Sequence, residues 1–480
     1  MSALPVGWES VPIGQIADIV SGGTPPSKDE RCFAQPGNGI PWLTPADLSG
    51  YKQQKISHGS RDLSEFGLQS CSAKLMPTGT VLFSSRAPIG YVAIAANPIC
   101  TNQGFKSFVF PPNIDSRFAY YQLRHIKPVA EAVATGTTFK ELSGSAASKL
   151  PFAIAPAAEQ KRIADKLVTV LTRVDAVNTC LARVAPLLKR FRQSVLAAAT
   201  SGRLTEDWRT KNPGGNATAE IAAQVANRSK QEKKEIAIPN LEHWALQIPS
   251  EWTVASVHQF AECLDRLRVP IKKDQRDAAK GLYPYYGANG EVGRIDQFIF
   301  DDELVLVTED ETFYGREKPI AYRSSGKCWV NNHAHVLRCK SVAANDYLCF
   351  ALMYYDVIPW LSGTTGRAKL TQQALLSLPI GVPPEAEQTE IVRRVETLFA
   401  FADRLEARLA QAQTAATRLT PALLAKAFRG ELVPQDPNDE PAAELLRRLQ
   451  AQRTTGAPAS KTGAGRGRGC KAAASAAANL

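Results

Sequence analysis

The stretch LPFAIAPAAEQKRIA at residues 150–164 returns in altered form as LPIGVPPEAEQTEIV at residues 378–392. A shift of 228 positions superimposes the two copies without a gap. The same shift goes on matching the chain well beyond them, where it pairs Gly202 with Gly430. The chain therefore contains an internal duplication.

Each copy continues into a region in which apolar residues alternate at spacings of four and three. A 3.5-residue repeat held over several heptads predicts two long helices that pair along a narrow seam, as in a left-handed coiled coil. We expect antiparallel pairing of helical spacers at 156–205 and 384–433, each with a helix of about 40 residues and roughly 60 Å. The predicted seam consists of Ile163, Leu167, Val170, Val174, Val177 and Leu181 in the first copy and Ile391, Val395, Leu398, Ala402, Leu405 and Leu409 in the second.

Local signals mark where these helices change direction or end. Pro186 and Pro421 lack the backbone N–H that a helix interior uses, so we expect a kink or a break at each. Gly202 and Gly430 suit the position just past a helix end. Taken alone, the two helices fit a purely structural spacer as well as any other role.

A segment of mixed strands and helix precedes each long helix, and we call residues 1–155 head 1 and residues 244–383 head 2. The fold class is therefore α+β, with two mixed α/β heads separated by two long helices that pair as an antiparallel coiled coil. The predicted strands are TVLF (80–83), YVAIAA (91–96) and FKSFVF (105–110) in head 1 and LVLV (304–307), PIAYR (319–323) and AHVLRC (334–339) in head 2. The predicted helices are SRFAYYQLR from 116 and NDYLCFALM from 345.

Two further segments differ in composition from the heads and helices. Residues 206–243 are mostly polar and punctuated by Gly and Pro, which indicates a linker with one short helix. Residues 434–480 form a tail. Beyond about residue 453 this tail is basic and rich in Gly and Ala, which predicts disorder.

The composition is that of a globular protein, with 44% hydrophobic and 21% charged residues. Its 480 residues are too many for one ordinary core. We expect a cytoplasmic location, because no apolar run is long enough to cross a bilayer and the first residues do not resemble a secretory signal. Nine cysteines without a C-x-x-C pair fit a reducing compartment.

The sequence lacks the motifs of the best-known catalytic sites, including G-x-x-x-x-G-K-[ST], H-E-x-x-H and G-x-S-x-G. We therefore expect no catalytic residues. The nearest approach to a metal site is Cys328, His333, His335 and Cys339, but the cysteine pairs of zinc sites are missing, so packing within a sheet explains them better. The acidic residues between 301 and 311 are better explained as solvated loop carboxylates than as a magnesium site. We expect no bound metal.

Lysine and arginine number 57 against 46 aspartates and glutamates, and the net charge of +11 favours a polyanionic partner. A reader of double-stranded DNA needs cations for the phosphates, and amide or guanidinium groups for base edges. Ordinary solvated surface explains any single such residue more simply, so they form only a pool. The pool in head 1 is Lys28, Arg31, Lys52, Arg86, Asn102, Gln103, Thr137, Thr138 and Lys140. The pool in head 2 is Lys272, Lys273, Arg276, Tyr285, Asn289, Arg316, Asn331, Asn332, Thr364, Thr365, Arg367 and Lys369.

Part of this pool belongs to a repeated turn, GTTFKEL at 136–142 and GTTGRAKL at 363–370. Each copy sets two hydroxyls beside a cation, and such a loop can donate to phosphate oxygens or enter a groove. A simple turn into the next element explains the motif equally well.

In this order, and duplicated, the motifs resemble those of the specificity subunit of type I DNA restriction-modification systems. The resemblance extends from about residue 7 to about residue 449. In the first half it rests on GWESVPIGQIADIVSGGTP, CTNQGFKSF, GTTFKEL, LPFAIAPAAEQKRIADKL and FRQSVLAAATSGRLTEDWR. In the second half it rests on WVNNHAHVL, GTTGRAKL, LPIGVPPEAEQTEIVRRVETLFAFADRLEARL and LLAKAFRGELV.

This resemblance implies that the heads are target-recognition domains, each of which binds one half of a split DNA sequence. It implies that the helices set the spacing between the halves and dock two methyltransferase subunits. The subunit itself would be no enzyme and would bind no cofactor. S-adenosylmethionine, ATP and Mg2+ are expected on the methyltransferase and restriction motor subunits.

The alternative is a non-catalytic coiled-coil scaffold with two protein-binding heads. It predicts no sequence-selective DNA binding and no loss of affinity with salt. A self-sufficient DNA enzyme is a third hypothesis, but it would need a cofactor motif that the sequence lacks.

Overall fold

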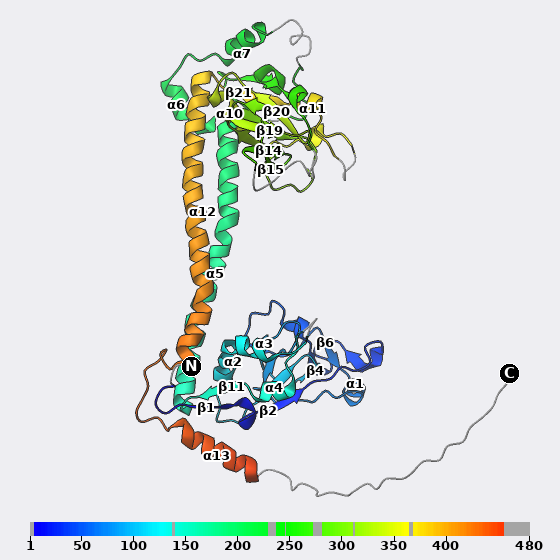
Figure 1. The fold of residues 1–480 in the computed structure, drawn as a ribbon, viewed down its shortest axis with the longest axis vertical. Helices are drawn as coiled ribbons and strands as arrows, with labels where there is room; N and C mark the ends of the chain where they lie inside the picture. The colour runs from blue at the N-terminus through cyan, green and yellow to red at the C-terminus, as the bar shows by residue number, and fades with distance from the viewer. Residues whose placement is uncertain are drawn as a thin grey trace, which may run out of the picture. The chain divides into compact units, whose positions relative to one another are not determined.

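The structure is a computed structural model that describes residues 4–136, 140–228, 237–244, 246–271, 281–310, 313–363 and 368–455, with side chains as far as residue 452. The chain divides into two compact units (Figure 1). Unit 1 combines Met1–Thr179 with Thr414–Leu480, and unit 2 is Cys180–Gln413. Head 1 therefore belongs to unit 1 and head 2 to unit 2.

Head 1 is built on sheets of two, five and four strands. The smallest joins β1 (Glu9–Pro12) antiparallel to β11 (Pro151–Ile154), the strand that carries the repeated LP phrase. The five-stranded sheet has the order β2-β10-β7-β8-β5 and the four-stranded sheet the order β3-β6-β4-β9. Their bounds are β2 (Asp18–Ser21), β3 (Phe33–Ala34), β4 (Ile40–Leu43), β5 (Lys55–Ile56), β6 (Arg61–Leu63), β7 (Val81–Phe83), β8 (Val92–Ala95), β9 (Cys100–Thr101) and β10 (Lys106–Val109).

The helix predicted from residue 116 is α2 (Ser116–His125), which packs against β7 and β8. The carboxylate of Asp115 accepts hydrogen bonds from the backbone N–H groups of Arg117 and Phe118, which otherwise lack partners at a helix start. Residues 118–123 of α2 are all buried, which is more than a full turn, and Phe118 and Leu123 lie fully inside the core of head 1. The other helices of head 1 are α1 (Glu65–Gln69), α3 (Lys127–Val133) and α4 (Gly144–Ser148).

Head 2 repeats this plan. Its β12 (Thr253–Ser256) pairs antiparallel with β21 (Pro379–Val382), as β1 does with β11. A sheet in the order β13-β20-β17-β18 corresponds to β2-β10-β7-β8 of head 1, and the other sheet has the order β15-β14-β19-β16. The strands are β13 (Glu262–Cys263), β14 (Tyr283–Gly287), β15 (Gly290–Ile295), β16 (Phe300–Asp301), β17 (Leu304–Thr308), β18 (Ala321–Ser324), β19 (Lys327–Val330) and β20 (Ala334–Arg338). The helices are α9 (Val257–Phe260), α10 (Val342–Leu352) and α11 (Gln372–Ser377). The strands and helices predicted for the two heads are confirmed.

The two long helices are present as α5 (Ala157–Thr200) and α12 (Glu385–Phe428), with 44 residues each. Each is continuous through its internal proline, so a break is wrong, because packing along the helix outweighs the loss of one hydrogen bond; the alternative of a kink stays a prediction. The expected terminators are confirmed, because Gly202 and Gly430 follow the helix ends with φ angles of 75° and 73°. That left-handed conformation favours glycine.

The helices pair antiparallel, as predicted (Figure 1). In unit 1 the start of α5 shares a core with the end of α12, so that Ile163 and Phe428 belong to one cluster. In unit 2 the later part of α5 meets the earlier part of α12, where Leu188 packs with Ala402 and Leu409. Residues that come later in α5 thus pack with residues that come earlier in α12, as antiparallel pairing requires.

One position of the predicted seam is wrong. Val177 is 48% exposed, whereas Leu171, outside the predicted seam, is only 7% exposed. Leu171 is buried because head 1 covers a second side of α5, where Ala164 and Leu171 both join the core of that head. The buried stripe is therefore wider than a two-helix seam. The other predicted seam positions are buried or half-buried.

The predicted linker and tail both contain packed helices. Within the linker lie α6 (Glu206–Lys211) and α7 (Ala217–Ala226), and α7 buries Ala217 and Ile221 on head 2. Within the tail, α13 (Ala442–Thr455) buries Ala442, Leu445 and Leu449 in the core of head 1. The disorder predicted beyond about 453 falls almost wholly on residues outside those described. None of the helices in the described residues combines the length and apolar character of a membrane span.

Candidate nucleic-acid interface

The repeated phrase Ala-Glu-Gln joins each head to its long helix. In unit 1 the indole N–H of Trp8 donates to Glu159 Oε2 at 3.0 Å, and in unit 2 the indole of Trp252 donates to Glu387 Oε2 at 2.9 Å. Each tryptophan directly precedes the first strand of its head, so the bond ties that strand to the first turn of the helix. The phrase is therefore a structural joint.

The glutamine of the phrase completes the joint. Gln160 Nε2 donates to the carbonyl of Ala155 at 2.8 Å, and Gln388 Nε2 donates to that of Pro383 at 2.9 Å. Both acceptors lie between the last strand of the head and the helix. These bonds fix the angle at which the strand enters the helix, because both glutamines are fully buried.

The second oxygen of the glutamate distinguishes the two joints. Glu387 Oε1 accepts hydrogen bonds from Thr205 at 2.7 Å and from Arg209 at 2.5 Å. Glu159 Oε1 is buried and has no hydrogen-bond partner among the described residues. Burial raises the pKa of Glu159, although the bond from Trp8 opposes the rise. The glutamate is therefore better satisfied in unit 2. The reverse holds for the glutamine, since Gln160 Oε1 accepts from the Asp115 N–H at 3.0 Å, whereas Gln388 Oε1 is buried without a partner among the described residues.

The two GTT turns are held at their bases by the same backbone bonds. Thr135 and Glu141 exchange hydrogen bonds across the base of the first turn, and Ser362 and Lys369 do so across the second. We call these two pairs the necks. The predicted contacts Thr137, Thr138, Thr364, Thr365 and Arg367 lie outside the described residues.

In head 1 the neck carries an acid and the sheet carries bases. Glu141 lies 3.6 Å from the guanidinium of Arg86 and 3.9 Å from the ammonium of Lys106. Lys106 is buried at the start of β10, and burial lowers the pKa of its amine although Glu141 opposes this. The candidate Arg86 thus already has an acidic partner.

In head 2 the charges at the neck are reversed. Lys369 Nζ lies 2.7 Å from Glu309 Oε1, and Glu309 also bonds the guanidinium of Arg268. Burial by itself raises the pKa of Glu309, but the hydrogen bonds from Lys369 and Arg268 outweigh it and hold this pKa below its usual value. His335 Nε2 donates to the carbonyl of Leu370 at 2.8 Å and adds a further tie between neck and sheet.

The same cluster is a candidate cation site. Asp265, Glu309 and His335 place three potential ligand atoms within 4.8 Å of one another. Arg268, however, pairs with both carboxylates, at 3.2 Å from Asp265, so the acidic charge is balanced by protein cations. A buried ion-pair network explains the cluster better than a metal, and the prediction of no metal stays a prediction.

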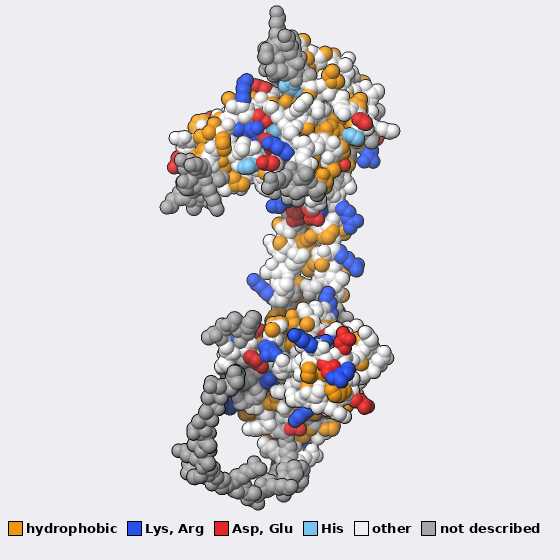
Figure 2. Space-filling model, turned by 90° about the vertical axis from the view of Figure 1, so that its right-hand side faces the viewer, with side chains coloured by type: hydrophobic (Ala, Val, Ile, Leu, Met, Phe, Trp, Pro, Cys, Tyr) orange, Lys and Arg blue, Asp and Glu red, His pale blue; other side chains and the backbone are white. Residues whose placement is uncertain are grey.

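The remaining candidates of head 1 lie mostly on its surface. Lys28, Lys52, Gln103 and Lys140 are exposed, and Asn102 is half-buried with its side-chain oxygen accepting from Gly104 N–H. Arg31 is exposed but forms an ion pair with Asp29 at 2.8 Å. Figure 2 shows that, on the face drawn there, basic side chains are interspersed with acidic ones on both units. The described surface in that view carries no single continuous basic patch.

Two candidates of head 2 are wrong as surface contacts. Tyr285 is 1% exposed and its hydroxyl accepts from Ile271 N–H, so it is a core residue. Asn331 is 6% exposed, and its side-chain oxygen accepts from His333 N–H. A side chain on a strand points to one of two faces, and residue type alone did not show which.

The other candidates of head 2 divide into exposed and paired residues. Asn332 and Lys369 are exposed. The guanidinium of Arg316 donates to the Asn289 side chain at 2.8 Å, so these two candidates form one unit. Lys272, Lys273 and Arg276 lie outside the described residues. Among the candidates that the structure describes, Arg86 and Lys369 lie at the two necks, and Arg316 and Asn289 contact each other.

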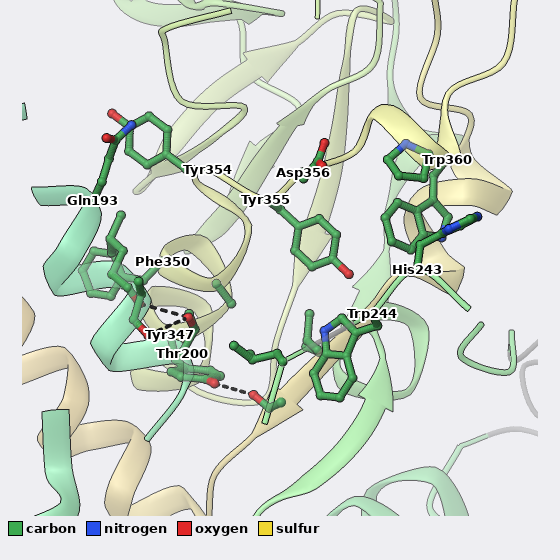
Figure 3. Close-up of a pocket in the computed structure, with 17 residues that line it drawn as sticks. Gln193, Thr200, His243, Trp244, Tyr347, Phe350, Tyr354, Tyr355, Asp356 and Trp360 are labelled. Carbon is green, nitrogen blue, oxygen red and sulfur yellow. Dashed lines mark hydrogen bonds between the residues drawn. The ribbon is translucent and has the colours of Figure 1, made fainter. Parts of the chain in front are cut away.

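Sequence reasoning missed a cavity of about 480 Å³ in unit 2 (Figure 3). It is lined by Trp244, Tyr347 and Tyr354 of head 2 and by Thr200 of α5. In unit 1 the shift of 228 puts Phe428 in the place of Thr200. The ring of Phe428 is buried against Phe118 and His125, with centroid distances of 5.4 and 5.3 Å. The duplicated register was the signal that could have identified this difference.

The comparisons with known sequences all point to one family. The family described as the type I restriction modification DNA specificity domain matches residues 5–184 and 249–413. The EcoDI specificity subunit of Escherichia coli is 27% identical over 475 residues, which are 94% of this chain and 96% of that protein. The MjaIX specificity subunit of Methanocaldococcus jannaschii is 37% identical over 174 residues, but these are only 36% of this chain and 39% of that protein.

Solved structures share the fold. A chain from a structure on complex assembly and conformational transition of the type I R-M system has a TM-score of 0.60 at 16% identity, covering 90% of this chain and 100% of that one. The HsdS subunit from Thermoanaerobacter tengcongensis has a TM-score of 0.53 at 18% identity, covering 89% and 98%. With two matched domains that span most of its length and the duplicated head-and-helix plan, the chain belongs to the family of type I restriction-modification DNA specificity subunits.

Proposed function

We propose that each head binds one half of a split DNA target and that α5 and α12 together set the spacing between the halves. The observation that carries this proposal is the duplication itself. Two heads that share the pairing of their first and last strands and one four-strand order are joined by the same Trp–Glu–Gln contacts to helices of equal length. Two related readers on one chain take the place of the two subunits of a DNA-binding dimer.

The chemistry on DNA is assigned to partners in this proposal. Two methyltransferase subunits dock on the helices and supply S-adenosylmethionine, while restriction motor subunits supply ATP and Mg2+ binding. This chain contributes recognition and no catalytic residue. A cytoplasmic location belongs to the same proposal, because the DNA that it would read lies there.

Methylation mapping tests the proposal. The chain would be co-expressed with methyltransferase subunits of its own system, and methylated adenines in host DNA would be mapped by single-molecule sequencing. We expect one split motif. Exchange of residues 1–155 for the first head of another family member should change one half of that motif only.

The matched control is exchange of residues 244–383, which should change only the other half. A stable complex that methylates nothing and ignores DNA sequence would contradict the proposal and favour a protein-binding scaffold. Simultaneous change of both halves by either exchange would contradict the assignment of one half to each head.

A further inference from the structure

The strand ladders define equivalent positions in the two heads. Leu142 N–H donates to the carbonyl of Ser85 at 2.9 Å, and Leu370 N–H donates to that of Glu309 at 2.8 Å. Ser85 and Glu309 are therefore equivalent, each following the central strand β7 or β17. By the same register the residue before the anchored leucine is Glu141 in head 1 and Lys369 in head 2.

The same ladders also relate the buried groups behind the necks. In head 2, His335 lies opposite Val307 across the β17–β20 ladder. In head 1, the antiparallel pairing of Phe108 with Val81 places Lys106 at the corresponding position of β10. A cation under an acidic neck in head 1 thus corresponds to an acid-rich cluster under a basic neck in head 2.

We propose that these ion pairs are positioning elements for DNA recognition: Glu141 with Arg86 and Lys106 in head 1, and Lys369 with Glu309 in head 2. The neck side chain is acidic in head 1 and basic in head 2, so each neck is complementary in charge only to the sheet of its own head. This inference rests on the proposed function, and it reassigns Arg86 and Lys369 from phosphate contacts to residues that hold a neck in place.

The physical basis is the place of each pair near the end of a central strand, β7 in head 1 and β17 in head 2. The backbone hydrogen bonds of Leu142 and Leu370 attach each neck to the end of the central strand. The ion pair between side chains adds a second, independent restraint on the position of the neck. Glu309 and Lys106 are nearly fully buried, so neither has the freedom to follow a displaced neck. A like charge at the neck would be repelled by a group that cannot move away.

Charge exchange at the necks tests the proposal with the full-length chain. The chain is allowed to select duplexes from a randomised library, and the bound duplexes are sequenced. Glu141→Lys and Lys369→Glu each install the residue that the other head carries. We expect Glu141→Lys to weaken selection for one half of the motif about ten-fold or more, and Lys369→Glu to do so for the other half.

Conservative and neutral variants distinguish positioning from general damage. Lys369→Arg should retain the wild-type motif, and Glu141→Gln should fall between wild type and Glu141→Lys. Lys74→Met, at an exposed lysine of head 1 outside the candidate pool, should leave the motif unchanged. A wild-type motif in both charge exchanges would overturn the inference while leaving the proposed function intact. Equal weakening of both halves by each exchange would also overturn it. A wild-type chain that selects no sequence overturns both proposals.

Discussion

The two halves of the molecule join head to helix in the same way but surround that joint differently. In both, a tryptophan before the first strand bonds the glutamate of the first helical turn. In unit 2 that glutamate has further donors, and a cavity lies between head 2 and the end of α5. In unit 1 the glutamate has an oxygen without a partner among the described residues, and the ring of Phe428 fills the place that corresponds to the cavity. The two copies thus share the contacts that fix the angle between head and helix, but they differ in how the space between head and helix is packed.

The largest expected effect is at the filled core. Phe428→Ala should destabilise unit 1 by roughly 3–5 kcal/mol, because a buried ring in contact with Phe118 and His125 is removed. Hydrogen exchange read by mass spectrometry, peptide by peptide, would locate the loss. Thr200→Ala is the matched control in unit 2 and should cost less than about 1 kcal/mol. Equal losses would show that the two sites are packed alike.

The joint of unit 2 comes next. Glu387→Gln should destabilise unit 2 by roughly 3 kcal/mol, because the guanidinium of Arg209, whose side chain is only 15% exposed, loses its charged partner. Chemical denaturation with hydrogen exchange on peptides of α6 and α12 measures the change. A loss of stability no larger than that of an ordinary surface mutation would contradict this, and would mean that Glu251, 3.8 Å from Arg209, is a sufficient charged partner for the guanidinium.

Filling the cavity should make unit 2 resemble unit 1. Thr200→Phe brings a ring to the position that Phe428 holds, and we expect a gain of about 1 kcal/mol, as is usual for cavity-filling changes. The midpoint of denaturation of unit 2 is the measurement. A loss of stability instead would show that Trp244 and Tyr354 cannot admit a second ring.

The smallest expected effect depends on pH. The folded pKa of Glu159 is raised above the usual value near 4.5, so folding favours the protonated acid, and the stability of unit 1 should fall as pH rises from there through the folded pKa. Glu159→Gln keeps an acceptor for Trp8 and removes this dependence, with a change of less than about 1 kcal/mol at neutral pH. Denaturation curves at several pH values decide this, and an unchanged pH profile would contradict it.

Local patterns were sufficient to predict the architecture. The 3.5-residue repeat identified α5 and α12 and their pairing, and apolar runs identified the strands that became β7, β8, β17 and β20. The helix α13 was missed because it has only a short apolar stripe, whose partner is head 1 at the other end of the chain. Short helices are stable mainly through tertiary packing, so a stripe of that length does not predict a helix unless the surface that it packs against is known.

The candidate site was harder to predict than the fold. Arg86 and Lys369 were placed in a pool of cations, but their partners Glu141 and Glu309 lie far from them in sequence. Tyr285 was placed in the same pool, although the pleat turns its ring inward. Charge and residue type identify candidate DNA contacts. Their roles depend on burial and on ion-pair partners, which are known only once the fold is known.

Unit 1 is assembled from both ends of the chain, since the N–H of Ala442 donates to the carbonyl of Gly7 at 2.8 Å and α13 closes the core of head 1. Unit 2 is one continuous segment. Proteins are translated from the N-terminus, and their domains generally fold as each emerges. Here head 1, which is made first, cannot be completed until α13 leaves the ribosome, whereas unit 2 can close before that. Translation that stops after residue 413 would leave a complete second unit and an unfinished first one.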